Sequence, residues 1–274
     1  MPGRSAASWA FIAFFKASSP AIQSLLTHVM THRPANWWRS FENKNGEGPD
    51  LRGRLCLFGD SDVHFWEGRY PTAEAVGVGV SGAEMPDIAF YAPRFVEKYA
   101  PQAVVWLGGA NDFFASRAPT DIVEQFKAGV AAIPSTTRVI YMGTKPELVS
   151  VRFYAGYQEL NTLMRDYAEE TPNVVYVQNW EDLQPEGMYR WDGLHLSQDG
   201  YDLWNCKVNA LLRPGLSLVD ARRLALNMTT ACLPKVVHAA EAASPATQAK
   251  ALSPLALAEA LRPVVATASG RLAR

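Results

Sequence analysis

Cysteine is scarce in this sequence. Only three of the 274 residues are cysteines, at positions 56, 206 and 232. Three cysteines at such wide spacing are too few for a disulfide framework, and none belongs to the closely spaced pairs that are typical of a zinc site. We therefore expect Cys56, Cys206 and Cys232 to be reduced thiols without a structural metal.

An excess of charge of one sign is also absent. The 26 basic and 27 acidic side chains give a formal net charge of -1. Such a balance produces no global field that would attract nucleic acid or an anionic membrane surface. We expect a small-molecule substrate rather than a polyanion, and no nucleic-acid partner. The composition leaves the oligomeric state open.

Long hydrophobic runs are missing as well. The apolar run at residues 9–15 is too short to cross a bilayer, so we expect no integral membrane segment. Arg4 precedes this run, Lys16 follows it, and no acidic residue comes before Glu42. A basic, acid-free leader with Ser and Ala is typical of organellar transit segments, and a surface-docked extension is the alternative. We expect residues 1–50 to form an N-terminal extension and favour a cytoplasmic location, with organellar targeting as the alternative.

The sequence does contain enough apolar residues for a full core. Hydrophobic residues make up 48% of the chain and charged residues 19%, as in ordinary globular domains. Between Arg54 and Leu212, short apolar runs alternate with segments of helical period, which predicts a parallel sheet covered by helices on both faces, a three-layer α/β/α sandwich. The five expected strands are residues 55–58, 75–80, 103–107, 139–142 and 174–177.

Helices are expected between these strands. Thr120 is a candidate N-cap of one helix, Ser197 begins the last core helix, and residues 213–215 end it. Pro93 should break or kink any helix at residues 87–99, because it lacks an amide hydrogen. The expected buried faces consist of Ile122, Phe126 and Val130; of Tyr157, Leu160, Met164 and Tyr167; and of Tyr201, Trp204, Val208 and Leu211.

The C-terminal part of the sequence has a different composition. Residues 239–274 are rich in Ala, Pro and Ser, contain few aromatics and show weak periodicity. Such a segment cannot bury enough apolar surface to fold by itself. We therefore expect a catalytic domain at residues 51–215 and a largely disordered C-terminal extension at residues 216–274.

Polar and glycine residues gather where the expected strands end. Ser61 follows the first strand, and His195 lies just before the last helix, with Asp192 three residues before it. Acyl transfer needs an activated hydroxyl, a base and a carboxylate that orients the base. These three residues supply this set, with Ser61 as nucleophile, His195 as base and Asp192 as its partner.

Acyl transfer also needs donors for the developing oxyanion. The backbone amides of Ser61 and Gly82, together with the side-chain amide of Asn111, are the expected oxyanion hole. Glycine at position 82 lets a substrate approach the backbone without a Cβ in the way. Gly82 and Asn111 follow the second and third expected strands, so they should lie at the same edge of the sheet as Ser61.

These motifs resemble the four blocks of the SGNH, or GDSL-type, hydrolase family, in the family's order. The resemblance covers the chain from Leu55 to Trp204. It implies a flavodoxin-like fold and a metal-independent, cofactor-free esterase, lipase or acylhydrolase that acts on small-molecule esters. The matching residues are Gly59-Asp60-Ser61, Gly82, the stretch 109–112, the stretch 192–195, and the segment 196–201 that follows it.

The sequence departs from the family pattern at two places. Asp62 replaces the leucine of the namesake motif, and the second block lacks the asparagine often found before its first glycine. Neither departure removes a catalytic atom. Asp62 does place a carboxylate beside the nucleophile, which is expected to disfavour anionic substrates or to perturb His195.

Several alternatives stay open. Residues 79–83 nearly match the nucleophile elbow of α/β-hydrolases around Ser81, but the terminal glycine is missing. A metal-dependent phosphoesterase could use Asp62 and His64 with Asn111 and Asp112 as ligands, although such a site would be short of histidines. An O-acyltransferase would use the same acyl-enzyme and differ only in the acceptor. A binding module that has lost activity is a further class, against which the complete set of catalytic residue types argues.

Overall fold

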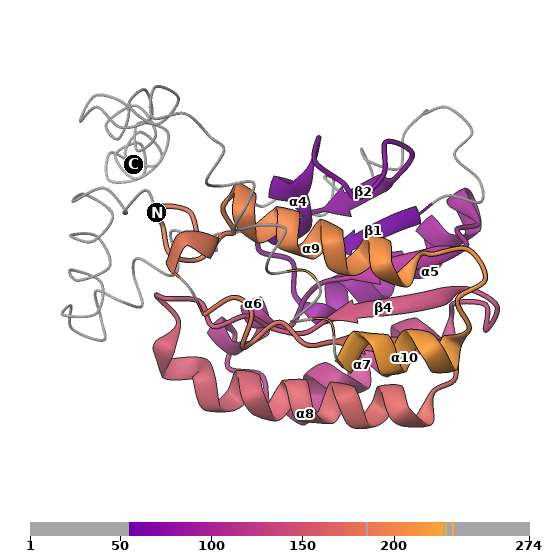
Figure 1. Cartoon of the computed structure of the whole chain (residues 1–274). Coiled ribbons are helices and arrows are strands. Elements are labelled where there is room, and N and C mark those ends of the chain that lie inside the picture. Colours follow the sequence, from indigo (N-terminus) through magenta and orange to yellow (C-terminus); the bar gives the residue numbers. More distant parts are fainter. Residues whose placement is uncertain (1–54, 185, 227, 229–231, 233–274) are drawn as a thin grey trace, which may run out of the picture.

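The computed structural model describes residues 55–184, 186–226, 228 and 232. Its centre is a sheet of five parallel strands in the order β2-β1-β3-β4-β5 (Figure 1). Because β1 lies between β2 and β3, it pairs with β2 through Leu57 and Gly77 and with β3 through Leu57 and Val105. The strands are β1 (Leu55–Gly59), β2 (Val76–Gly79), β3 (Ala103–Trp106), β4 (Arg138–Met142) and β5 (Val174–Val177).

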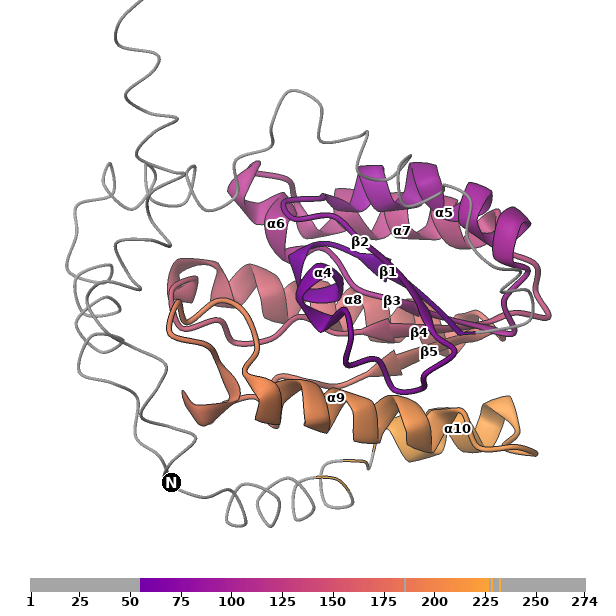
Figure 2. The same ribbon diagram turned by 90° about the horizontal axis from the view of Figure 1, so that it is seen from above.

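Helices cover both faces of this sheet, as Figure 2 shows from above. One face carries α5 (Met85–Tyr99), α7 (Pro119–Ala131) and α8 (Tyr154–Glu170), and the other carries α4 (Ser61–Trp66), α9 (Gln198–Leu211) and α10 (Leu218–Leu226). Three short elements, α6 (Ala110–Phe114), η1 (Val151–Phe153) and η2 (Glu186–Met188), lie in loops. The expected three-layer α/β/α sandwich with five parallel strands is confirmed.

The alternation of side chains along each strand explains the two cores. In β1, Cys56 and Phe58 pack into the core under α5 and α7, whereas Leu55 and Leu57 pack into the core under α4 and α9. Successive side chains of a strand point to opposite faces, so a strand buried on both sides must be apolar throughout. This is why the apolar runs predicted the strands well.

Two details of the helices differ from expectation. The helix α5 runs without interruption from Met85 to Tyr99 with Pro93 inside it, so of the expected break or kink, the break is wrong. Its neighbours Ala92 and Phe95 are buried in the core, and this packing compensates for the hydrogen bond that proline cannot donate. Thr120 is not an N-cap, because α7 begins one residue earlier at Pro119, whose fixed φ suits the first helical position.

The start and the buried face of the last expected core helix are confirmed. Ser197 caps α9, and its side chain accepts a hydrogen bond from the Gly200 amide at 3.3 Å. The expected face is fully buried against the sheet and consists of Tyr201, Trp204, Val208 and Leu211. Since α9 follows His195 directly, its anchoring fixes one end of the loop that carries this histidine.

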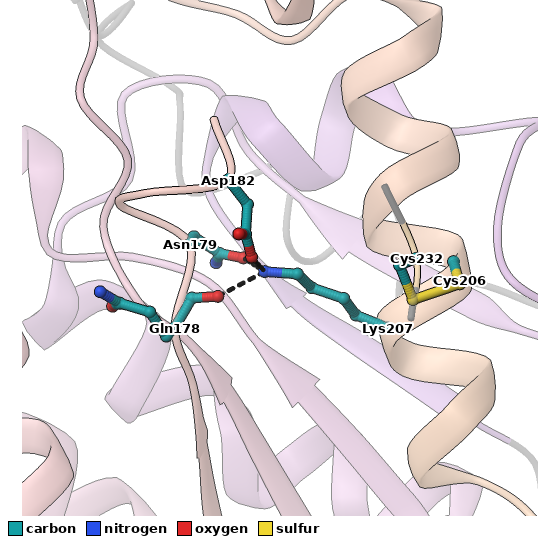
Figure 3. The surroundings of a disulfide bond; sticks show 6 residues. All are labelled: Gln178, Asn179, Asp182, Cys206, Lys207 and Cys232. Carbon is teal, nitrogen blue, oxygen red and sulfur yellow. Dashed lines mark hydrogen bonds and ion pairs between the residues drawn. A yellow bond between two sulfur atoms is a disulfide. The ribbon is translucent and has the colours of Figure 1, made fainter. Parts of the chain in front are cut away.

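The expectation that all three thiols are reduced is wrong. Cys206 in α9 and Cys232 form a disulfide with a Cα–Cα distance of 5.8 Å (Figure 3). Cys56 is a free buried thiol in β1. Next to Cys206, the buried Lys207 points the other way and pairs with Asp182. The 26-residue separation of the two half-cystines gave no local signal of their pairing.

The folded part of the chain extends past residue 215. Helix α10 packs against β5, with Ala221 and Ala225 buried in the core. The disulfide to Cys232 then ties the chain after α10 to α9. The expected N-terminal extension at residues 1–50 and the Ala-, Pro- and Ser-rich stretch at residues 239–274 lie outside the described residues.

Within residues 55–226, no described helix combines the length and the apolar character that crossing a bilayer would require.

Candidate active site

The first segment of the site is the turn between β1 and α4. Ser61 is the first residue of α4, and Asp60 caps this helix by accepting a hydrogen bond from the Asp62 amide at 2.9 Å. Gly59 is required here, because a Cβ at this position would lie 2.7 Å from the Leu107 carbonyl oxygen. The amide of Ser61 is one of the first-turn amides that have no carbonyl partner within the helix. The turn therefore presents both the hydroxyl and the amide of Ser61 at the carboxyl edge of the sheet.

The second segment brings an imidazole and a carboxylate to this hydroxyl. Nε2 of His195 lies 3.0 Å from Oγ of Ser61, and Nδ1 lies 2.8 Å from Oδ2 of Asp192. An ionised Asp192 can only accept, so Nδ1 donates its proton to it and Nε2 is left to accept from the serine hydroxyl. The structure thus joins Ser61 to His195, which lies 134 residues later in the chain, and through it to Asp192 in one hydrogen-bonded row.

The charge of Asp192 is maintained by its hydrogen bonds. Burial disfavours the ionised form, but the imidazole of His195 and the backbone amides of Leu194 and His195 all interact with the carboxylate. These interactions outweigh burial and hold the pKa of Asp192 below its ordinary value. Asp192 therefore stays ionised at neutral pH and fixes the tautomer of His195.

A small closed loop sets the position of His195. Tyr189 and Leu196 form an antiparallel bridge at its base, and the Arg190 amide donates to the His195 carbonyl oxygen at 2.7 Å. Gly193 takes a positive φ of 68° inside the loop, and its amide donates to the Arg190 carbonyl oxygen. This backbone closure leaves the imidazole little freedom to move away from Ser61.

The expected oxyanion residues lie beside this row. Gly82 has a φ of 77°, a conformation that favours glycine. Nδ2 of Asn111, the second residue of α6, donates to the carbonyl oxygen of Ala83 at 2.9 Å and lies 3.5 Å from Oδ2 of Asp60. These contacts bring the turns after β1, β2 and β3 together, as their place at one edge of the sheet predicts.

The carboxylate of Asp60 lies between the first and third of these turns. Burial, and after it the charge of Asp62, raises the pKa of Asp60 to about 7. At neutral pH this carboxyl group therefore carries only part of a full negative charge. The immediate surroundings of Ser61 are less anionic than the Gly59-Asp60-Ser61-Asp62 sequence suggests.

The carboxylate of Asp62, the residue after Ser61, is engaged by a buried lysine. Its Oδ2 accepts a hydrogen bond from Nζ of Lys145 at 2.6 Å, and Lys145 also pairs with Oε1 of Glu147 at 2.9 Å. Both Lys145 and Glu147 are buried. Burial alone would lower the pKa of Lys145, but the carboxylates of Asp62 and Glu147 raise it well above its ordinary value. The ammonium thus stays charged and pairs with the extra carboxylate of the first block as well as with Glu147.

Lys145 and Glu147 are site-supporting residues that the sequence interpretation missed. Glu147 is held in turn by hydrogen bonds from Ser150 at 2.6 Å and Tyr157 at 3.2 Å. The network links the loop after β4 to helix α4, which carries Ser61. A lysine in a polar loop is usually exposed, so the local sequence does not predict that Lys145 is buried.

The geometry does not support the metal-site alternative. Asp62 is directed at Lys145, and His64 is exposed on α4. Asp112 accepts a hydrogen bond from the Met85 amide at 2.9 Å, and burial raises its pKa to about 7, which suits a structural role. In the described part of the chain, no three His, Cys, Asp or Glu side chains are grouped as metal ligands would be.

The alternative nucleophile Ser81 lies after β2 on an exposed turn. No hydrogen bond joins its hydroxyl to an imidazole among the described residues, whereas Ser61 makes such a bond. The near match of residues 79–83 to a nucleophile elbow is therefore explained by the turn that presents Gly82.

Comparison with known proteins identifies the family of the chain. The model of the GDSL-like lipase/acylhydrolase family matches residues 58–203, whereas no curated protein sequence matches the chain significantly. A candidate platelet activating factor from Streptococcus pneumonia has a similar structure, with a TM-score of 0.52 and 17% identity over 67% of this chain and 94% of that chain. A candidate acylhydrolase from Bacteroides fragilis gives a TM-score of 0.50 and 20% identity over 65% of this chain and 98% of that chain.

At these identities, the structural likeness establishes the fold. The sequence match carries the family assignment, because it spans more than half of the chain and includes the turns of Ser61, Gly82 and Asn111 together with Asp192 and His195. The protein therefore belongs to the GDSL-like lipase/acylhydrolase family, the SGNH hydrolases.

Proposed function

We propose that the protein is a serine ester hydrolase that cleaves carboxylic esters through an acyl-enzyme on Ser61. The observation that carries the proposal is the row of hydrogen bonds from Ser61 Oγ through the imidazole of His195 to Asp192, at 3.0 Å and 2.8 Å. Nucleophilic catalysis by serine needs a base within hydrogen-bond reach and a group that orients the base. Membership of the acylhydrolase family supports the same reaction class.

In the acylation step, Ser61 Oγ attacks the ester carbonyl carbon as His195 Nε2 takes its proton. The tetrahedral intermediate collapses, and His195 returns the proton to the departing alcohol oxygen. Water then attacks the acyl-enzyme with the same base, which releases the acid and restores the Ser61 hydroxyl. Asp192 remains ionised throughout and stabilises the imidazolium that forms twice in each cycle.

The oxyanion would be bound by the amides of Ser61 and Gly82 and by Nδ2 of Asn111. One N–H of Asn111 is engaged with the Ala83 carbonyl oxygen at 2.9 Å, which fixes the orientation of the side chain. The contact with Asp60 is longer, at 3.5 Å, and beyond the usual range of an N–H···O hydrogen bond. The second N–H is therefore the one available to a developing negative charge.

Replacing Asn111 tests this role. We expect Asn111→Ala to lower kcat by about 10²-fold or more, because removal of a single oxyanion donor has an effect of that order. The measurement is steady-state hydrolysis of an aryl acetate, with circular dichroism as the check on folding. A folded Asn111→Ala protein with near-normal kcat would remove Asn111 from the oxyanion hole.

The reaction class itself is tested with two chromogenic substrates. We expect cleavage of 4-nitrophenyl acetate, no cleavage of bis(4-nitrophenyl) phosphate, and no effect of a chelator, because no metal takes part in the proposed chemistry. Free acetate should appear in step with 4-nitrophenol. Transfer of the acetyl group to an added alcohol in place of water would make the protein an acyltransferase, and chelator-sensitive cleavage of the phosphate diester would make it a phosphoesterase.

A further inference from the structure

Arg190 pairs through its backbone with the catalytic His195 in the loop that Tyr189 and Leu196 close. Its amide donates to the His195 carbonyl oxygen at 2.7 Å, and its carbonyl oxygen accepts from the Gly193 amide at 3.1 Å. The two backbone bonds make the position of Arg190 depend on the same loop closure as that of His195. Its side chain is exposed. The backbone of Arg190 is thus held beside the catalytic loop, and its side chain begins close to His195.

An aromatic ring connects the guanidinium to the imidazole. Cζ of Arg190 lies 4.8 Å from the centroid of the Phe65 ring, and this ring meets the His195 ring edge-on with 4.5 Å between centroids. Together, these separations keep the guanidinium within about 10 Å of the imidazole, roughly the Debye length at 0.1 M ionic strength. Stacking on an aromatic face also holds a guanidinium in one orientation. Arg190 is therefore positioned close enough to contact a substrate seated on His195.

The guanidinium of Arg190 has no ion-pair partner in the described part of the protein. No described carboxylate forms an ion pair with its guanidinium. The closest candidate in the loop, Asp192, directs Oδ2 at the imidazole and Oδ1 at two backbone amides. Asp62, which would repel an anion, is paired with the ammonium of Lys145, which it shares with Glu147. The edge of the site beside His195 therefore presents a guanidinium that forms no ion pair with a described carboxylate.

From this geometry we propose that Arg190 selects esters whose alcohol part carries an anionic group, a carboxylate or a phosphate. The inference rests on the proposed ester hydrolysis. His195 must pass its proton to the alcohol oxygen, so the alcohol part leaves from the side of the imidazole. An anion a few bonds beyond that oxygen comes within reach of the guanidinium, whose planar fork suits carboxylate and phosphate oxygens.

The test compares two acetyl esters that differ in charge and by one methyl group, 4-acetoxybenzoate and its neutral methyl ester. Both release a phenol that absorbs in the ultraviolet, and the measured quantity is the ratio of their kcat/KM values. We expect Arg190→Gln to lower the ratio of anionic to neutral ester about tenfold or more, since hydrogen bonds to charged groups are the strong ones. Arg190→Lys should lower it less, because the charge remains and the fork is lost.

The matched control is Arg94→Gln. Arg94 is another exposed arginine stacked on an aromatic ring, 4.9 Å from the centroid of Phe90, but on helix α5 and with no contact to the catalytic residues. Arg94→Gln removes the same charge as Arg190→Gln, but away from the catalytic residues, so the ratio of kcat/KM values should not change. The preference of the unmodified protein should also weaken as salt is raised, because Arg190 is exposed.

Two results would overturn the inference in different ways. If Arg190→Gln lowers turnover of both esters by the same factor, Arg190 only supports Phe65 and His195, and the selectivity proposal is wrong while ester hydrolysis stands. If the unmodified protein cleaves neither ester faster than Ser61→Ala does, the proposed function fails and takes the inference with it.

Discussion

Ser61→Ala is expected to lower kcat for ester hydrolysis by about 10⁶-fold, the order of magnitude found when the nucleophile of a serine hydrolase is removed. The substitution deletes one oxygen from a partly buried side chain at the first position of α4. The helix, its Asp60 cap and the His195–Asp192 pair keep their partners. The protein should therefore fold normally and still lose turnover, which steady-state kinetics on 4-nitrophenyl acetate would measure.

The matched control is the other serine that follows a strand of this sheet. Ser81→Ala removes an exposed hydroxyl that makes no hydrogen bond to a described imidazole. Turnover should stay close to that of the unmodified protein. Loss of hydrolysis in Ser81→Ala, with survival in Ser61→Ala, would transfer the nucleophile to the turn after β2 and reverse the assignment.

Asp192→Asn is expected to lower kcat by about 10⁴-fold, as the same change does in the Ser-His-Asp template. An asparagine can keep its oxygen on the amides of Leu194 and His195, so the loop stays closed. Its NH₂ group then faces Nδ1 of His195 and donates to it. This places the ring proton on Nε2, which can no longer accept the proton of Ser61. The tautomer is wrong although the geometry is kept.

Asp121→Asn controls for the loss of an aspartate elsewhere. Asp121 is exposed in the first turn of α7, far along the chain from the loop of His195, and its replacement should leave kcat unaltered. If a folded Asp192→Asn protein loses only a few-fold in kcat, another group orients the histidine and the role given to Asp192 is wrong.

The sequence predicted the sheet well because of how this fold buries its strands. In β3, and in β4 after Arg138, the residues facing both layers are apolar, so each strand contains an uninterrupted run such as Ala103–Trp106. The edge strand β2 was the least clear, since half of it is glycine and it is shorter than the expected 75–80. The candidate site residues could be proposed because each follows a strand or precedes a helix, where polar residues interrupt the apolar pattern.

Other features depend on contacts between distant parts of the chain and leave no local pattern. The path of the chain after α9 determines two of these features, the disulfide between Cys206 and Cys232 and the packing of α10 on β5. Burial of Lys145 is decided by Asp62, which lies 83 residues earlier in the sequence. Tertiary contacts of this kind reverse local preferences, as they also do for Pro93 within α5.

Labelling with a fluorophosphonate, followed by mass-spectrometric mapping of the modified peptide, tests most directly whether Ser61 is an activated nucleophile. We expect one phosphonylated residue, Ser61, with labelling lost in Ser61→Ala, unaffected by a chelator and much slower in Asp192→Asn. An active protein that takes no label, or that carries it on another serine such as Ser81, would show that Ser61 is not the nucleophile.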